Sequence, residues 1–285
     1  MNKDKRKLDL VVLSDLHLGT YGCQSEAIYE YLQDIDPKIL VLNGDIIDIW
    51  SFDKKYFPEF HIRVIQKILK MASKGTKVYY LLGNHDEAIR RYADFELGNI
   101  KLCNKLVLNL DGKKTWIFHG DIFDLSIQHT KFLAKLGGKG YDLLILLNAI
   151  INKFCDRFGF EKFSLSKKIK ESIKQAVKYI NDFEQTAIEH AIDQGYDQVI
   201  CGHLHSPVIR TAQIDHKKVV YLNSGDWVEN CSALEYSNSE WVLYKHPISN
   251  KKKKTVSHNF ENSFHINIPN TQALYEDIVF DSGYR

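Results

Sequence analysis

The stretch "LLGNHDEAIRRY" (residues 81–92) sets an amide, an imidazole and a carboxylate side by side, directly after an apolar run and a glycine. These side chains belong to Asn84, His85 and Asp86. Asn is a poor nucleophile and a poor acid, but its carbonyl oxygen is a reasonable ligand for a hard metal ion. The stretch therefore predicts a buried strand that ends at a metal site, provided that the rest of the chain supplies further ligands.

Other short apolar runs end in residues of the same kind. Runs rich in Val, Ile and Leu begin near positions 8, 38, 77, 115 and 198, and their near-continuous apolarity is typical of strands covered on both faces. The polar residues that follow these runs are Asp15, His17, Asp45, Asp48, Asn84, His85, Asp86, His119, Asp121, His203 and His205. In a strand-based sheet they would gather at the carboxyl edge, where α/β proteins build their sites.

Helical patterns alternate with these strands, which predicts an α/β layered domain. One such pattern covers residues 59–75, where an apolar face is assigned to Ile62, Ile65, Ile68, Leu69 and Ala72. After residue 207 the chain changes to short strand-like pieces joined by hairpin-type turns.

We expect two parts in the chain. Residues 1–248 form one domain, and residues 249–285 form a loosely packed tail with weak periodicity. Within the domain, residues 125–195 read as a helical insertion, far longer than the roughly twelve residues that a crossover helix needs. The surplus helix is therefore predicted to cover another surface of the molecule.

Composition limits the class of protein and its location. Hydrophobic residues make up 44% and charged residues 26% of the chain, as in soluble globular proteins. The formal net charge of +2 is too small to predict a nucleic-acid partner. Five scattered cysteines suit reduced thiols better than disulfides. With no recognisable signal peptide or membrane span, we expect a cytoplasmic protein.

The ligand residues are too many for one ion and suit two ions that share a carboxylate. Mixed imidazole and oxygen donors without thiolate favour Mn²⁺, Fe or Zn²⁺ over Ca²⁺. Two such ions, ~3.5–4 Å apart, grip both ends of an in-line displacement at phosphorus. A single D-x-H or H-x-H is more often a surface pair, but five compatible motifs at five strand ends favour the metal interpretation. The remaining histidines, such as His61, are interpreted as structural.

The motifs D-x-H, GD-x-x-D, GNHD, HGD and GH-x-H occur in this order, and the chain from about residue 8 to 230 resembles the calcineurin-like metallophosphoesterases. The resemblance implies an α/β sandwich of two mixed sheets flanked by helices. It implies two divalent metal ions, for which we expect Mn²⁺. The ligands that it implies are Asp15, His17, Asp45 and His205 for one ion, and Asp45, Asn84, His119 and His203 for the other.

The same resemblance implies a catalytic pair next to the ligands. His85 would contact the phosphate and assist the departure of the leaving group. Asp86 would orient the His85 ring. These two residues are the expected catalytic residues, and Asn84 fills a coordination site without adding charge.

A narrower resemblance concerns the substrate. The stretches "GYDLLILLN", "FSLSKKIKESIKQAVKYINDFE", "VICGHLHSP" and "YLNSGDWVENCSALE" resemble the bacterial UDP-2,3-diacylglucosamine pyrophosphatases. This implies hydrolysis of a nucleotide-diphospho-lipid to lipid X (2,3-diacylglucosamine 1-phosphate) and UMP in lipid A biosynthesis. Members of that group carry Arg at the position of His85, so a soluble phosphodiester or nucleotide substrate is the second hypothesis. A non-catalytic interaction module is the third, and it would require missing ligands.

The insertion at 125–195 distinguishes between the first two hypotheses, which are an acylated and a soluble substrate. Its middle, from Leu143 to Phe154, is apolar on more than one helical face, which predicts a lid that encloses acyl chains. The alternative is a helical hairpin that buries this surface against itself. A stripe of lysines in the insertion predicts peripheral contact with the cytoplasmic face of the membrane, although a solvated helix face has the same pattern. The stripe consists of Lys167, Lys170, Lys174 and Lys178.

Overall fold

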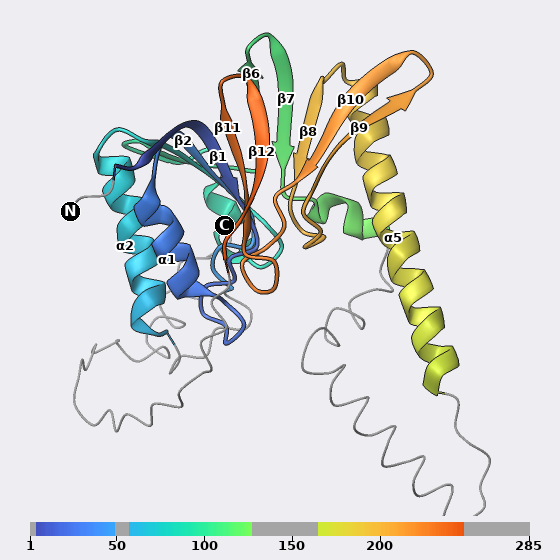
Figure 1. Ribbon diagram of the computed structural model, residues 1–285, viewed down its shortest axis with the longest axis horizontal. Helices are drawn as coiled ribbons and strands as arrows, with labels where there is room; N and C mark the ends of the chain where they lie inside the picture. Colours follow the sequence, from blue (N-terminus) through green and yellow to red (C-terminus); the bar gives the residue numbers. More distant parts are fainter. Residues whose placement is uncertain (1–3, 49–56, 127–164, 248–285) are drawn as a thin grey trace, which may run out of the picture. The chain divides into compact units, whose positions relative to one another are not determined.

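The computed structural model describes residues 4–48, 57–126 and 165–247, and for 124–126 and 165–175 it describes the backbone alone (Figure 1). The predicted tail at 249–285 and most of the predicted lid therefore lie outside the described residues. Within the described residues, no helix is both long and apolar enough to cross a bilayer.

The first sheet has seven strands in the order β12-β11-β1-β2-β3-β5-β4. Its central strands β1, β2, β3 and β5 run parallel, while β11 pairs with β1 in the antiparallel direction. The strands are β1 (Arg6–Leu13), β2 (Ile35–Asn43), β3 (Lys77–Leu81), β4 (Glu96–Leu97), β5 (Ile100–Cys103), β11 (Ser232–Ser237) and β12 (Glu240–Lys245). The sheet is therefore mixed.

The second sheet has five strands in the order β6-β7-β8-β10-β9. Here β7, β8 and β10 run parallel, and the edge strands β6 and β9 are antiparallel to their neighbours. The strands are β6 (Lys105–Leu110), β7 (Lys113–Phe118), β8 (Gln198–Cys201), β9 (Val208–Ile214) and β10 (Lys217–Asn223). The sequence predicted all of these strands except β6.

Helices cover the outer faces of the two sheets (Figure 1). The helices α1 (Ser25–Asp34) and α2 (Glu59–Ser73) pack on the first sheet, and α5 (Leu165–Asp193) packs on the second. Two 3₁₀ helices, η1 (Glu87–Tyr92) and η2 (Asp121–Ser126), follow β3 and β7. This arrangement confirms the predicted sandwich of two mixed sheets flanked by helices.

Three layers of apolar side chains explain why the strand sequences are so continuously apolar. On β1, Val11 packs toward the helices α1 and α2, whereas Val12 packs between the two sheets. Neighbouring side chains of a strand point to opposite faces, so a strand in the middle of this sandwich needs apolar residues at successive positions. The third layer joins α5 to the second sheet through side chains such as Phe183 and Ile188.

The buried face of α2 differs from the predicted one. Ile62 and Leu69 were assigned to the core, but they are 45% and 50% exposed. The buried residues are His61, Val64, Ile68, Met71 and Ala72. Apolar residues surround most of this helix, so its periodicity allows more than one buried face, and packing against α1 and the sheet selects one of them. The buried ring of His61 accepts a hydrogen bond at Nδ1 from the backbone N–H of Gly19, 2.8 Å away, which is a structural role.

Candidate metal centre

The loops that follow β1, β2, β3, β7 and β8 carry the predicted site residues, and they meet at the carboxyl ends of these strands. Both sets of strands run parallel within their sheets, so their carboxyl ends share one edge. Three groups of potential ligand atoms gather there, each with its atoms within 4.8 Å of one another. The groups are Asp15, His17 and His205; Asp45, His119 and His203; and His17, Asp48 and His85.

Asp45 lies between the groups. Its Oδ1 is 3.4 Å from His119 Nε2, while its Oδ2 is 4.0 Å from His17 Nε2 and 3.9 Å from His85 Nε2. The Oδ1 atom also accepts a hydrogen bond of 2.9 Å from the backbone N–H of His85, in the loop that carries Asn84. A carboxylate whose two oxygens face different imidazoles has the geometry of a bridge between two ions.

Burial makes the electrostatics of these residues strong. Asp15 is fully buried and Asp45 is nearly so. Burial by itself raises the pKa of the Asp45 carboxyl, but the imidazoles of His119, His17 and His85 outweigh it and hold the pKa below its ordinary range. In the same way, burial opposes the charge on His119, yet Asp45 and Asp15 raise its pKa to about 10.

A similar pair lies on the other side of the site. His205 Nε2 is 3.1 Å from Asp15 Oδ1. Burial opposes the charge on His205, and Asp15 raises its pKa to about 9. The carboxylates of Asp15 and Asp45 therefore stabilise positive charge where they face the imidazoles. A divalent cation bound to the same atoms would supply this positive charge.

The ring nitrogens are oriented as metal ligands require. His119 Nδ1 donates a hydrogen bond of 2.8 Å to the backbone carbonyl of Asn43, which directs Nε2 toward Asp45. The Nε2 atoms of His17 and His119 are buried and make no hydrogen bond. A buried imidazole nitrogen without a hydrogen bond is costly unless another group binds it, so these donors fit divalent ions.

Backbone strain is concentrated in the same loops. Asp15, His17, Asp45, His203 and His205 all have left-handed backbone angles, with φ between 49° and 64°. Residues with a side chain rarely adopt this conformation, which costs on the order of 1 kcal/mol or more for each residue. The fold holds the five residues there because these backbone angles direct their side chains to one point.

Close approach of the loops leaves no space for a side chain at Gly83. A Cβ atom at this position would overlap the carboxylate and the backbone nitrogen of Asp45. At Gly44, where φ is +82°, a Cβ atom would overlap the ring of His119. The glycines of the motifs therefore let the loops after β2, β3 and β7 pack against one another.

Asp48, and not Asp86, lies against the ring of His85. The Oδ2 atom of Asp48 is 3.0 Å from His85 Nδ1 and 3.3 Å from His17 Nδ1. Contact with Asp48 raises the pKa of His85 and outweighs the opposing effect of burial. Asp48 therefore contacts a potential catalytic ring and a potential ligand ring together.

Asp86 contacts groups other than the His85 ring. Its buried carboxylate accepts hydrogen bonds from the backbone N–H groups of Ile46, Ile47 and Gly83 and from the hydroxyl of Tyr80, the last at 2.8 Å. These contacts fix the loop after β2 to the loop after β3. These described contacts do not include the ring of His85, and the orienting role of Asp86 stays a prediction.

The Asp of the HGD motif also stabilises a loop. Asp121 forms an ion pair of 2.6 Å with Arg90, which lies on η1 after the GNHD loop. Arg90 also donates a hydrogen bond of 3.2 Å to the backbone carbonyl of Gly83. Arg90 therefore joins the loops after β3 and β7, and nothing in the sequence pattern indicated this role.

The helix α5 contributes one side chain to the metal edge that the sequence did not reveal. The hydroxyl of Tyr179 lies 3.4 Å from His203 Nε2. One turn further along, Phe183 is buried against the second sheet, 6.1 Å from the His203 ring. Packing of Phe183 therefore fixes the position at which Tyr179 reaches the site.

Comparisons with known proteins show which proteins this chain is similar to. The model of the calcineurin-like phosphoesterase family matches residues 8–207. A protein of Aliivibrio fischeri named UDP-2,3-diacylglucosamine hydrolase is 27% identical and covers 84% of this chain and 98% of its own length. A protein of the same name from Shewanella putrefaciens is 28% identical and covers 83% and 96%. The solved structure of an archaeal phosphodiesterase covers 83% and 98% at 14% identity, with a TM-score of 0.40 that carries no weight here.

Proposed function

This chain belongs to the calcineurin-like phosphoesterase family and is a metal-dependent hydrolase, and from that premise we propose that it hydrolyses the pyrophosphate of UDP-2,3-diacylglucosamine or a close analogue. The products are UMP and 2,3-diacylglucosamine 1-phosphate, and the reaction belongs to lipid A biosynthesis. The observation that carries the proposal is the position of Asp45 between two groups of ligands. The relatives that match nearly all of their own length supply the substrate class.

The residues divide into two sets of ligands around Asp45. Divalent ions bound there would supply Lewis-acid charge that offsets the negative charge developing on phosphate oxygens. Mixed imidazole and oxygen donors suit Mn²⁺, Fe or Zn²⁺, and of these we propose Mn²⁺ as the metal. The proposed ligands are Asp15, His17, Asp45 and His205 for one ion, and Asp45, Asn84, His119 and His203 for the other.

His85 is the proposed general acid. Hydrolysis adds water across one P–O bond of the pyrophosphate, and the departing oxygen needs a proton. The side chain of His85 is 30% exposed, so a substrate can reach it, and its Nε2 faces Asp45 Oδ2. Asp48 raises the pKa of His85, which favours the doubly protonated ring that can give the Nε2 proton away while Nδ1 stays next to Asp48.

Measuring UMP release tests this function. The full chain is assayed with Mn²⁺ on UDP-2,3-diacylglucosamine, on UDP-N-acetylglucosamine, which lacks the long acyl chains, and on bis-p-nitrophenyl phosphate. We expect kcat/KM for the acylated substrate to exceed that for UDP-N-acetylglucosamine by at least about tenfold, because each buried methylene stabilises binding by ~0.8 kcal/mol. Activity should disappear after chelation and return with Mn²⁺.

The second candidate function is hydrolysis of a soluble phosphodiester or nucleotide. The presence of His85 favours this candidate, because GNHD is the generic form of this motif among phosphoesterases, whereas the pyrophosphatases carry Arg at this position. Equal kcat/KM values for acylated and non-acylated substrates would support this candidate over the first one. The predicted lid falls largely outside the described residues, so its role in enclosing acyl chains stays a proposal.

We also propose peripheral contact with the cytoplasmic face of the inner membrane, where an acylated substrate resides. The proposal rests on the predicted lysine stripe of α5, of which the side chain of Lys178 is described and exposed. Sedimentation of the protein with anionic vesicles at low and at high salt tests it. Absence of binding in both conditions would contradict this contact.

A further inference from the structure

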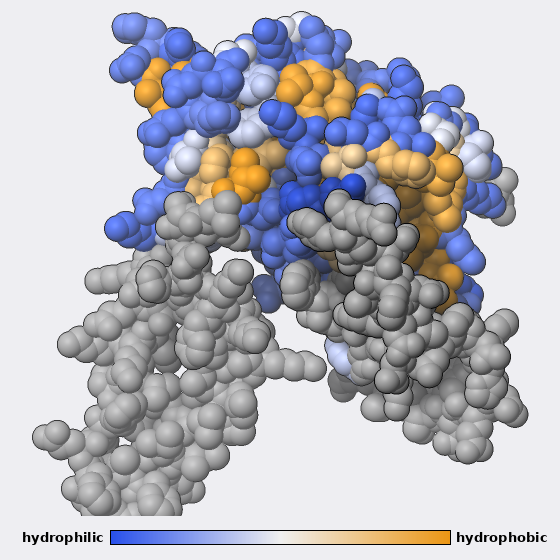
Figure 2. Space-filling view, turned by 180° about the vertical axis from the view of Figure 1, so that it is seen from behind, coloured by the Kyte–Doolittle hydropathy of each residue, from blue (hydrophilic) through white to orange (hydrophobic). Residues whose placement is uncertain are grey.

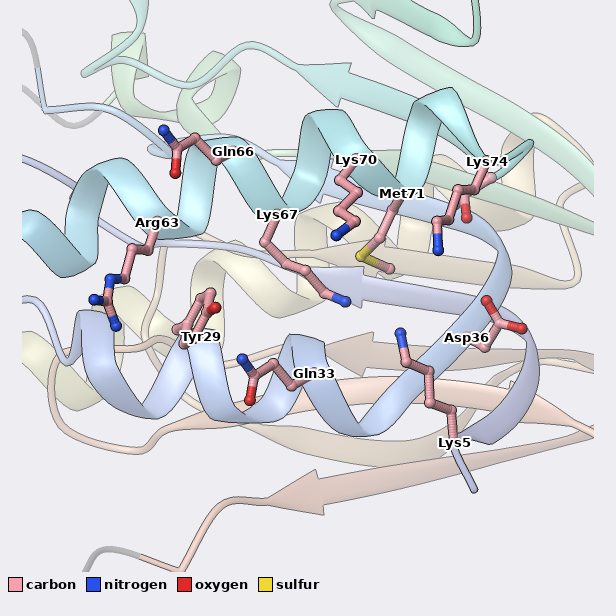
Figure 3. A pocket seen from close by; sticks show the side chains of 11 residues that line it. Lys5, Tyr29, Gln33, Asp36, Arg63, Gln66, Lys67, Lys70, Met71 and Lys74 are labelled. Atoms are coloured by element: carbon pink, nitrogen blue, oxygen red, sulfur yellow. The ribbon is translucent and has the colours of Figure 1, made fainter. Parts of the chain in front are cut away.

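A second concentration of charge lies in a groove between α1 and α2 (Figure 3). The groove encloses a cavity of about 320 Å³. Its basic lining residues are Lys5, Arg63, Lys67, Lys70 and Lys74. Figure 3 shows the lysines of α2 and Lys5, from the chain just before β1, extending toward the same space.

The groove is separate from the metal centre. Lys5 precedes β1 and Thr76 precedes β3, so these lining residues lie at the amino ends of the parallel strands. The metal centre lies at their carboxyl ends. A ligand in the groove at this end therefore does not contact the reacting atoms.

Negative charge to balance the lysines is missing among the described residues. Asp36 is the one acidic residue that lines the groove, and no described ion pair joins Lys5, Lys67, Lys70 or Lys74 to a carboxylate. Other surface lysines of the described chain form ion pairs. Lys38, for example, pairs with Asp9 at 2.7 Å. Clustered cations without counter-ions repel one another, and an anion would relieve this repulsion.

Lys67 experiences this repulsion most strongly. Its side chain is half-buried on the wall of the groove. Burial, together with the neighbouring Lys5, Lys70 and Lys74, lowers the pKa of Lys67 to about 8. A bound anion would offset the repulsion among the lysines and raise the pKa of Lys67 again, because a nearby negative charge favours the protonated amine.

Neutral donors complete the lining. Gln33 of α1 and Gln66 of α2 are the lining residues with side-chain amides. Amide and ammonium N–H groups together suit the several oxygens of a phosphate better than a lone carboxylate. Exposed Ile62 and Leu69, on the adjoining face of α2, would also let the groove approach a lipid surface.

We propose that the groove between α1 and α2 binds a phosphate-bearing anion with at least two negative charges, independently of the metal centre. The ligand is either a soluble diphosphate compound or the phosphate headgroups of anionic lipids. The chemistry of recognition is the same in the two cases, so the experiment has one arm for each source. The proposal does not depend on the substrate proposed above.

Lysine labelling of the Mn²⁺-loaded full chain tests the proposal locally. The protein is treated at pH 8 with trace acetic anhydride, with and without inorganic pyrophosphate, and the modified peptides are measured by mass spectrometry. At pH 8, a rise of about one unit in the pKa of Lys67 reduces its reactive amine about fivefold. The groups that face Lys67 are Lys5, Arg63, Lys70, Lys74 and Asp36. We expect saturable protection of Lys67, with Lys105 of β6 unchanged.

The second arm replaces pyrophosphate with vesicles of phosphatidylcholine, with or without phosphatidylglycerol. Protection of Lys67 that requires phosphatidylglycerol identifies a lipid source, and protection by pyrophosphate identifies a soluble one. The double variant Lys70→Gln and Lys74→Gln keeps Lys67 as the labelled residue and should lose its protection, while Lys105→Gln and Lys217→Gln, with the same change in charge, should retain it. Turnover of a small diester should stay within about twofold in both variants, because neither touches the metal centre. The proposal is wrong if neither anion protects Lys67, or if Lys105 is protected equally.

Discussion

The metal edge and the groove between α1 and α2 lie at opposite ends of the same parallel strands, and they differ in how their charges are balanced. At the metal edge the carboxylates are buried, each faces an imidazole, and the backbone is strained around them. In the groove the cations stand on an ordinary helix surface, and no described lining residue has a left-handed backbone. Strain and burial therefore distinguish the chemical site from a surface site that would serve binding alone.

The two sites also differ in how neighbouring charges affect a cationic side chain. The carboxylates of the metal edge raise the pKa of His119 to about 10 and that of His205 to about 9, so they already stabilise cations. The lysines of the groove lower the pKa of Lys67 to about 8, so they destabilise one another. Changes at the first site should abolish catalysis, whereas changes at the second should affect binding without affecting turnover.

The largest expected effect comes from Asp45→Ala. Both groups of ligands lose a carboxylate that faces them, so we expect turnover of bis-p-nitrophenyl phosphate to fall by at least about 10⁴-fold. Bound Mn²⁺, measured by elemental analysis, should fall as well. The matched control is Asp182→Ala on the exposed side of α5, which should retain activity and metal. Full activity of a metal-free Asp45→Ala protein would refute the metal centre.

His85→Ala should have the next largest effect. Loss of a general acid lowers turnover by ~10²–10⁴-fold, while the proposed ligands remain. We therefore expect the metal content, measured on the same sample, to stay near that of the unmodified protein. Loss of metal in this variant would show that His85 is a ligand instead.

Asp48→Asn should shift the pH dependence. Contact with Asp48 raises the pKa of His85, and a general acid loses activity as the pH rises through its pKa. Removing the negative charge lowers this pKa, so the alkaline limb of kcat should move to lower pH. Asp86→Asn should leave the alkaline limb in place, because Asp86 bonds to Tyr80 and to backbone groups. A shift in Asp86→Asn alone would assign the orienting role to Asp86.

The smallest expected effect at the metal edge comes from Tyr179→Phe. The hydroxyl of Tyr179 lies 3.4 Å from His203 Nε2, and loss of one hydrogen bond lowers turnover by about two- to tenfold. Steady-state kinetics on a small diester measures this change. Val177→Ala, on an exposed position of the same helix, should have no effect. Equal losses in the two variants would mean that α5 acts through its packing and not through the hydroxyl.

The sequence predicted the central strands because their signal is local. A strand covered on both faces must be apolar at successive positions, as in β1, β2 and β8, and this pattern is visible without any partner. The edge strand β6 alternates between exposed and half-buried positions, β4 has two residues, and β5 has four that are mostly half-buried, so these three strands were not recognised. The helix α1 was also missed, because it is ten residues long and no side chain caps its start.

The gathering of the ligand residues was predictable for a related reason. Ligand chemistry is a property of residue type, and parallel strands bring their carboxyl ends to one edge whatever the details of packing. Asp15, His17, Asp45, His119, His203 and His205 therefore lie together at the edge expected from the strand ends. Their individual ligand roles stay predictions.

By itself, then, the sequence determined the strands whose ends carry the site residues and the residues that gather at their carboxyl edge, because residue type and strand periodicity are encoded locally. Only the tertiary structure decided that Asp48 contacts His85, that Tyr179 reaches His203, and that α2 exposes Ile62. The same holds for the basic groove, whose lysines come from α2 and from the chain before β1. Each of these contacts joins segments that are distant in the chain or chooses one side of a loop or helix, and such choices are made by packing, which no local pattern records.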